Sequence, residues 1–233
     1  MTDACPATPG APGTAAARAL ARRRALMAGL ALLAAAPLAA CGRKAPRGQA
    51  VPPDATVLAL GDSLTSGVGA SADTAYPAVL QRLTGWKVVN GGVSGDTSAQ
   101  ALERLPALLQ KHQPALVIVG IGGNDFLRRQ SATATRANIR SICTQARASG
   151  AQVVLVAVPE LSLLAASAGL LSDHAMYGEI AGELKIPLHR KGWSTVLADA
   201  SLRSDQIHAN AAGYERFAQG LVETLKSAGL LVR

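Results

Sequence analysis

A serine near the start of the folded part and an acid–base pair near its end are best suited to chemistry. Ser63 stands in a Gly-Asp-Ser-Leu turn, directly after a short apolar run that predicts a strand. Asp205 and His208 are three positions apart, so the carboxylate can accept from one imidazole nitrogen while the other faces outward. A neutral imidazole held in this way can take the proton of a serine hydroxyl, which is the first step of acyl transfer.

Donors that could stabilise a tetrahedral oxyanion follow the predicted strands. The backbone N–H of Ser63 should be free at a strand-to-helix turn, and Gly95 lets its N–H approach a ligand because no Cβ intervenes. Asn124, in Gly-Gly-Asn-Asp, adds a side-chain amide. Each such donor is worth on the order of 3 kcal/mol in a transition state. The combination predicts acyl transfer through a serine.

Neighbouring polar residues are expected to serve structure. Asp62 and Asp125 should cap helices or tie loops, and Asp96 and Thr97 should serve the start of the helix beginning at residue 98. The other histidines are expected to be structural or at the surface: His112, His174 and His189. Asp125, Asp205 and His208 could supply metal ligands, but no second histidine stands at ligand spacing. We therefore expect neither a metal nor a cofactor.

The rest of the sequence alternates short apolar runs with helical stretches. The runs lack polar alternation, as expected for strands covered on both faces, and span residues 57–60, 88–89, 116–119 and 153–157, with a weaker fifth at 187–189. The helical stretches span residues 77–83, 98–111, 135–149, 176–184 and 214–225, the last capped by Asn210 and ended by Gly229. This alternation predicts a parallel sheet between two layers of helices, with the second helix bent or split at Pro106.

These residues resemble the four sequence blocks of the SGNH (GDSL) hydrolase family, carried here by Ser63, Gly95, Asn124 and His208. The resemblance implies a three-layer α/β/α, flavodoxin-like fold with a five-stranded parallel sheet in the order 2-1-3-4-5. It also implies a Ser63–His208–Asp205 triad, and an oxyanion hole formed by the N–H groups of Ser63 and Gly95 and the amide of Asn124.

The resemblance runs from Thr56 to the final helix and is closest to the bacterial periplasmic thioesterase, lysophospholipase and arylesterase branch. One departure is Ala209, where many members carry proline after the histidine. The missing proline should loosen that loop slightly without touching the triad.

The first forty residues read as an export signal. Arg22-Arg23-Arg24 precedes an apolar stretch that ends Leu-Ala-Ala-Cys at Cys41, which resembles a bacterial lipobox. We expect a lipoprotein signal over 1–40, with the twin-arginine route left open, a lipidated tether over 41–54 and the hydrolase domain over 55–233. The alternative is an ordinary cleaved signal with a chance cysteine. The lipoprotein interpretation implies an exported, periplasm-facing protein anchored to the membrane through Cys41.

Composition excludes several classes of protein. The formal net charge is +8, but the cations form no stripe and aromatic residues make up 3% of the chain, so a nucleic-acid surface is not expected. With 49% hydrophobic and 16% charged residues, the bulk of the chain is not disordered. Cys143, on a helical apolar stripe, should be a buried small hydrophobe. Nothing in the sequence indicates an obligate protein partner.

The substrate is the least determined feature. Residues 159–177 are leucine-rich and include Leu163, Leu164 and Leu170, which could wall an acyl pocket or simply pack on the core. The wall favours carboxylic esters or thioesters with aryl, short-to-medium acyl or lysophospholipid-like groups. One alternative is an O-acetyl esterase or acyltransferase acting on cell-wall saccharides. The other is a lipid-anchored binding protein with an inactive site.

Overall fold

The computed structural model describes residues 1–2, 4, 48–160 and 171–232. Cys41 and the three leucines of the expected pocket wall lie outside these residues. A five-stranded parallel sheet is central, in the order β2-β1-β3-β4-β5, as predicted. Its strands are β1 (Thr56–Gly61), β2 (Lys87–Gly92), β3 (Leu116–Gly120), β4 (Gln152–Val156) and β5 (Leu188–His189).

The strands are covered on both faces, which explains their continuous apolar sequences. Every residue of β3 is buried, as are the last five of β1. In the register of the sheet, Gly61 at the end of β1 stands beside Gly92 of β2 and Gly120 of β3. The turns that follow these three strands therefore leave the same edge of the sheet, where α/β proteins place their ligands.

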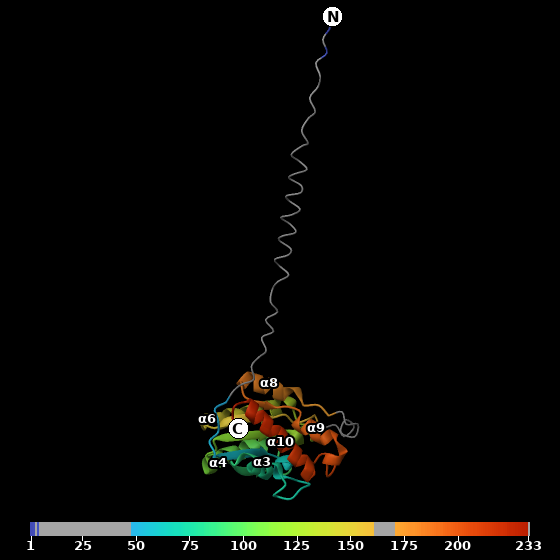
Figure 1. The fold of residues 1–233 in the computed structure, drawn as a ribbon. Helices are drawn as coiled ribbons and strands as arrows, with labels where there is room; N and C mark the ends of the chain where they lie inside the picture. Colours follow the sequence, from blue (N-terminus) through green and yellow to red (C-terminus); the bar gives the residue numbers. More distant parts are fainter. Residues whose placement is uncertain (3, 5–47, 161–170, 233) are drawn as a thin grey trace. The chain divides into compact units, whose positions relative to one another are not determined.

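Two layers of helices cover the sheet (Figure 1). One core unites Val57 and Ala59 with helices α3 (Tyr76–Thr84), α9 (Gly192–Ala198) and α10 (Ala211–Ser227). The other unites Leu58 and Leu60 with helices α4 (Ser98–His112), α6 (Ala132–Ala148) and α8 (Ala175–Leu184). The other helices within the described residues are short: α2 (Ser63–Ser66), α5 (Gly123–Leu127) and the 3₁₀ turn η1 (Ala200–Leu202). The three-layer prediction is confirmed.

The sequence signals at the helix ends are also confirmed. The Thr97 side chain accepts from the N–H of Gln100, and the Gln100 side chain accepts from the N–H of Thr97, which completes the capping box of α4. Asn210 caps α10 by accepting from the N–H of Gly213. Of the two expected effects of Pro106, a bend or a split of the helix, the split does not occur, because the proline lies inside a single helix of 15 residues.

The described part of the domain begins before the expected boundary at residue 55. The N–H of Gly48 donates to the carbonyl of Ala228, and that of Val51 donates to the carbonyl of Leu230, each at 2.8 Å. Val51 is 4% exposed and belongs to the core beneath α10. Residues 48–51 are therefore packed on the domain by the buried side chain of Val51 and by these two backbone hydrogen bonds. No helix within 48–160 or 171–232 is long and apolar enough to span a bilayer.

Candidate active site

Ser63 is placed by a sharp turn at the end of β1. Gly61 ends the strand, and a Cβ there would collide with the Thr65 side chain and the carbonyl of Gly120, so only glycine fits. The Asp62 side chain accepts from the N–H of Leu64 at 3.1 Å and thereby caps α2. Ser63 is the first residue of that helix, so no earlier turn accepts its backbone N–H.

The three residues expected to form a triad are hydrogen-bonded in sequence. His208 Nε2 lies 3.0 Å from Ser63 Oγ, and His208 Nδ1 lies 2.7 Å from Asp205 Oδ2. An ionised Asp205 is an acceptor only, so Nδ1 carries the proton and Nε2 is left to accept the serine hydroxyl. The geometry is that of a general base directed at a nucleophile.

The Asp205 carboxylate is held by its own loop. Its Oδ1 atom accepts from the N–H groups of Ile207 and His208, both at 2.8 Å. Burial acts to raise the pKa of Asp205, but the hydrogen bonds from the His208 side chain and from these N–H groups outweigh it and hold the pKa below its ordinary value. The group is thus ionised at neutral pH, as an imidazole-orienting carboxylate must be.

Gly95 and Asn124 lie beside Ser63. Gly95 has a φ of +85°, a left-handed conformation that favours glycine. Asn124 Nδ2 donates to the carbonyl of Asp96 at 2.9 Å, and this amide nitrogen carries a second N–H. One cavity of about 140 Å³ is lined by all three expected oxyanion donors, by the imidazole of His208 and by Leu127 and Ile207. The fold has therefore gathered every residue of the two expected groups.

Asp62 and Asp125 have the structural roles expected of them. Asp125 is fully buried; its carboxylate accepts from the N–H of Ser98 at 2.8 Å, from the Ser98 hydroxyl and from the Thr135 hydroxyl. Asp125 thus links α5 to α4 and α6. Its carboxylate is bonded to Ser98 and Thr135 and is not grouped with Asp205 and His208 as a set of metal ligands. Among the residues in the described ranges, no three His, Cys, Asp or Glu side chains are grouped to hold a metal ion.

The expectation for Asp96 is only partly right. Thr97 caps α4, but the Asp96 carboxylate pairs with Arg104, whose Nε lies 2.7 Å from Oδ2. Arg104 is the residue near the site that the sequence reasoning missed. The separation of eight positions between Asp96 and Arg104 gives no local signal, because the pair forms only when α4 packs against the sheet.

The other histidines and the cysteine are structural, as predicted. His112 lies in the last turn of α4, and His174 caps α8 and stacks on Phe126 with ring centroids 4.7 Å apart. Cys143 is fully buried, and burial raises the pKa of its thiol to about 12.

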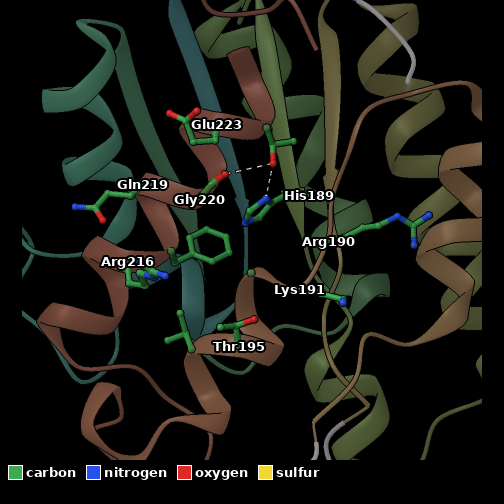
Figure 2. A pocket seen from close by; sticks show the side chains of 12 residues that line it. His189, Arg190, Lys191, Thr195, Arg216, Gln219, Gly220 and Glu223 are labelled. Atoms are coloured by element: carbon green, nitrogen blue, oxygen red, sulfur yellow. Dashed lines mark hydrogen bonds between the residues drawn. The ribbon is translucent and has the colours of Figure 1, made fainter. Parts of the chain in front are cut away.

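His189 borders a second cavity, of about 460 Å³, between β5, α9 and α10 (Figure 2). Its Nδ1 lies 2.8 Å from the hydroxyl of Thr224, which in turn donates to the carbonyl of Gly220. Burial lowers the pKa of His189 to about 4, so the ring is neutral. Figure 2 shows the Arg190 side chain directed away from this histidine. The His189 ring packs edge-to-face against Phe217, with the ring centroids 5.1 Å apart.

A parallel α/β sheet with a Ser–His–Asp array and convergent oxyanion donors at its carboxyl edge defines a serine hydrolase. The GDSL-like Lipase/Acylhydrolase family model matches residues 59–216, and the chain belongs to that family.

Known relatives agree with this assignment. Esterase TesA of Pseudomonas aeruginosa is 34% identical over 179 residues, which cover 73% of this chain and 88% of that protein. Thioesterase 1/protease 1/lysophospholipase L1 of Escherichia coli is 39% identical over 161 residues, covering 66% and 76%. A crystal structure of TesA has a TM-score of 0.67 at 32% identity and covers 74% of this chain and 99% of that chain. The chain is a hydrolase of ester bonds.

Proposed function

We propose that the enzyme cleaves carboxylic esters and thioesters through an acyl-enzyme on Ser63. His208 Nε2 takes the hydroxyl proton as Ser63 Oγ attacks the carbonyl carbon. The N–H groups of Ser63 and Gly95 and the amide of Asn124 hold the oxyanion. The leaving group departs with the proton from His208, and a water deprotonated by the same imidazole then hydrolyses the acyl-enzyme. Asp205 orients the ring and stabilises its charged form, and no cofactor takes part.

The observation that carries this proposal is the continuous hydrogen-bonded series from Asp205 through His208 to Ser63, with links of 2.7 and 3.0 Å. A base must lie within hydrogen-bond reach of the proton that it removes. Both links meet this requirement before any substrate is bound.

The proposed substrates have aryl, short-to-medium acyl or lysophospholipid-like groups. The cavity at Ser63 is small, and its apolar lining comes from Leu64, Leu127 and Ile207. The names of the two relatives, an esterase and a thioesterase/lysophospholipase, support the same substrate classes. Leu163, Leu164 and Leu170 are proposed to extend the acyl wall, on the strength of the leucine-rich sequence that follows β4.

Export and anchoring are proposed from the sequence before the domain. The basic residues at 22–24, the apolar stretch after them and the small residues before Cys41 favour a lipoprotein signal. The proposed mature protein is a periplasm-facing lipoprotein whose acyl chains on Cys41 hold it to a bacterial membrane.

A substrate series tests the function. Purified enzyme is offered p-nitrophenyl esters of increasing chain length, an acyl thioester, a lysophospholipid and an O-acetylated saccharide. We expect turnover of the first three classes and a loss of at least about 10⁴-fold in the Ser63→Ala variant. Turnover that survives in Ser63→Ala contradicts the proposal. A clear preference for the acetylated saccharide selects the O-acetyl esterase alternative.

The same ester series tests the leucine wall. Leu163→Asn and Leu170→Asn should shift the chain-length profile toward shorter esters, because a polar amide disfavours a long acyl chain. Leu83→Asn is the matched control, since Leu83 is 48% exposed on α3. An unchanged profile in the first two variants rejects the wall.

A further inference from the structure

One guanidinium holds together the turns that carry the oxyanion donors. From the second turn of α4, Arg104 reaches back to the edge of the sheet. Its Nε donates to Asp96 Oδ2 at 2.7 Å, Nη1 to the carbonyl of Gly91 at 2.7 Å and Nη2 to the carbonyl of Gly61 at 2.9 Å. The side chain of Arg104 is 23% exposed and that of Asp96 10%, so these bonds are largely shielded from water.

Each acceptor belongs to a different part of the site. Gly61 is the last residue of β1, two positions before Ser63. Gly91 lies near the end of β2, from which the loop to Gly95 departs. Asp96 follows Gly95 directly.

The link extends to the third donor through Asp96. Its backbone carbonyl accepts from Asn124 Nδ2 at 2.9 Å, so moving Asp96 would move the amide that donates to it. Arg104 therefore bonds directly to Asp96, which follows Gly95 in the chain and accepts from Asn124. It also bonds to Gly61, two residues before Ser63.

We propose that Arg104 is a positioning residue that sets the spacing of the three oxyanion donors. This proposal rests on the roles proposed above for Ser63, Gly95 and Asn124. A planar guanidinium can donate along three fixed directions at once, whereas the ammonium of lysine is a compact charge that cannot reproduce the fork. Oxyanion stabilisation depends on donors that are already in place, and misplacement by about 1 Å can cost about 10²-fold in rate.

The consequence is specific to the transition state. The substrate's carbonyl binds weakly to these donors before attack, and the donors bind strongly only once the oxygen is charged. Loss of the spacing should therefore lower kcat and leave KM nearly unchanged. It should not shift the acidic limb of the pH–rate profile, because the hydrogen bonds of Arg104 go to Asp96, Gly91 and Gly61 and not to His208 or Asp205.

Kinetics of Arg104→Gln and Arg104→Lys test the proposal in the otherwise unchanged enzyme. With a p-nitrophenyl ester, and rates normalised to active sites titrated with a fluorophosphonate, we expect Arg104→Gln to lower kcat by about 10²-fold with KM within about twofold. Phosphonylation should slow by a similar factor, since it forms a charged oxygen in the same hole. Arg104→Lys keeps the charge beside Asp96 and should lose less.

Arg140→Gln is the matched control, because it removes an exposed ion pair with Glu183 on the surface between α6 and α8. Its kcat should stay within about twofold of that of the wild type. If Arg104→Gln does not fold, Arg104→Lys decides alone. A kcat within twofold of wild type in the folded variants, or a loss confined to KM, overturns the positioning role. A wild type that turns over no ester overturns the proposed function instead, so the two failures are distinguishable.

Discussion

Asp62 lies between the strand that ends at Gly61 and the nucleophile, and its carboxyl group is buried. It is 3% exposed, and burial raises its pKa from 3.8 to about 7. The N–H of Leu64 and the charge of His208 oppose this shift and are outweighed. The folded protein therefore keeps the Asp62 proton at pH values where the unfolded chain has released it.

This difference makes stability depend on pH. Because the folded pKa is raised, the contribution of Asp62 is fully present below about pH 4 and is lost as the pH rises through about 7. Asp62→Asn removes the titration and keeps an acceptor for Leu64. From pH 5 to pH 8 we expect the free energy of unfolding of the wild type to fall by about 2–3 kcal/mol relative to this variant.

Urea denaturation of both proteins at the two pH values measures the difference, and other titrating groups cancel between them. A difference that is constant with pH, or that changes in the opposite direction, contradicts the raised pKa.

Residue types in the sequence were enough to predict the catalytic residues, but not the arginine that holds the surrounding turns. Ser63, Asp205 and His208 could be assigned because each stands in a short motif whose residue types are suited to one reaction. Arg104 could not, because two of its three acceptors are the backbone carbonyls of Gly91 and Gly61. Every residue has such a carbonyl, so the sequence does not indicate which ones accept a hydrogen bond from a side chain. A side chain that hydrogen-bonds to the backbone of neighbouring strands can be identified only when the order and register of those strands are known.

At the scale of elements, α4 has a stabilising capping box at its first turn and a destabilising proline, Pro106, in its interior. Its capping box satisfies two N–H groups at the first turn, and Leu105 and Leu109 bury one face in the core. Pro106 follows Leu105 directly but points to solvent. These contacts explain why the helix is not split at Pro106, where the sequence predicted a bend or a split.

Pro106 should nevertheless cost stability. A proline inside a helix removes one backbone hydrogen bond and crowds the carbonyl four residues earlier. We expect Pro106→Ala to raise the free energy of unfolding by about 1–2 kcal/mol, part of the gain being offset by the greater freedom of the unfolded chain.

Urea denaturation at neutral pH measures this change, with Gln110→Ala, an exposed change in the same helix, expected to stay within about 0.5 kcal/mol. A Pro106→Ala variant that is no more stable than the wild type would show that the helix has adapted fully to the ring.

Strand lengths show where local patterns stop being informative. Only residues 88–89 were predicted in the second strand, yet β2 runs from Lys87 to Gly92. Asn90, Gly91 and Gly92 have low strand propensity, and pairing with β1 extends the strand through them. The short helices α2, α5 and α9 were not predicted either, because four to seven residues are too few for a periodic signal.

At the scale of the whole molecule, the fold brings together groups that are 145 positions apart in sequence. Ser63 hangs from the first strand of the sheet, while His208 precedes α10, which packs against α3 on one face. Tyr214 of α10 reinforces this juxtaposition, since its hydroxyl donates to the carbonyl of Val68 at 2.7 Å. The sheet order could be predicted only by resemblance, because alternation of strands and helices does not specify which strands are neighbours.

The measurement that tests the account most directly is the site of covalent attack. Native enzyme is treated with a fluorophosphonate at neutral pH, digested and analysed by mass spectrometry. We expect a single phosphonyl adduct on Ser63, slowed by at least about 10³-fold in His208→Ala, because the imidazole removes the hydroxyl proton. An adduct on any other residue, or labelling of Ser63 at an undiminished rate without His208, would contradict the account.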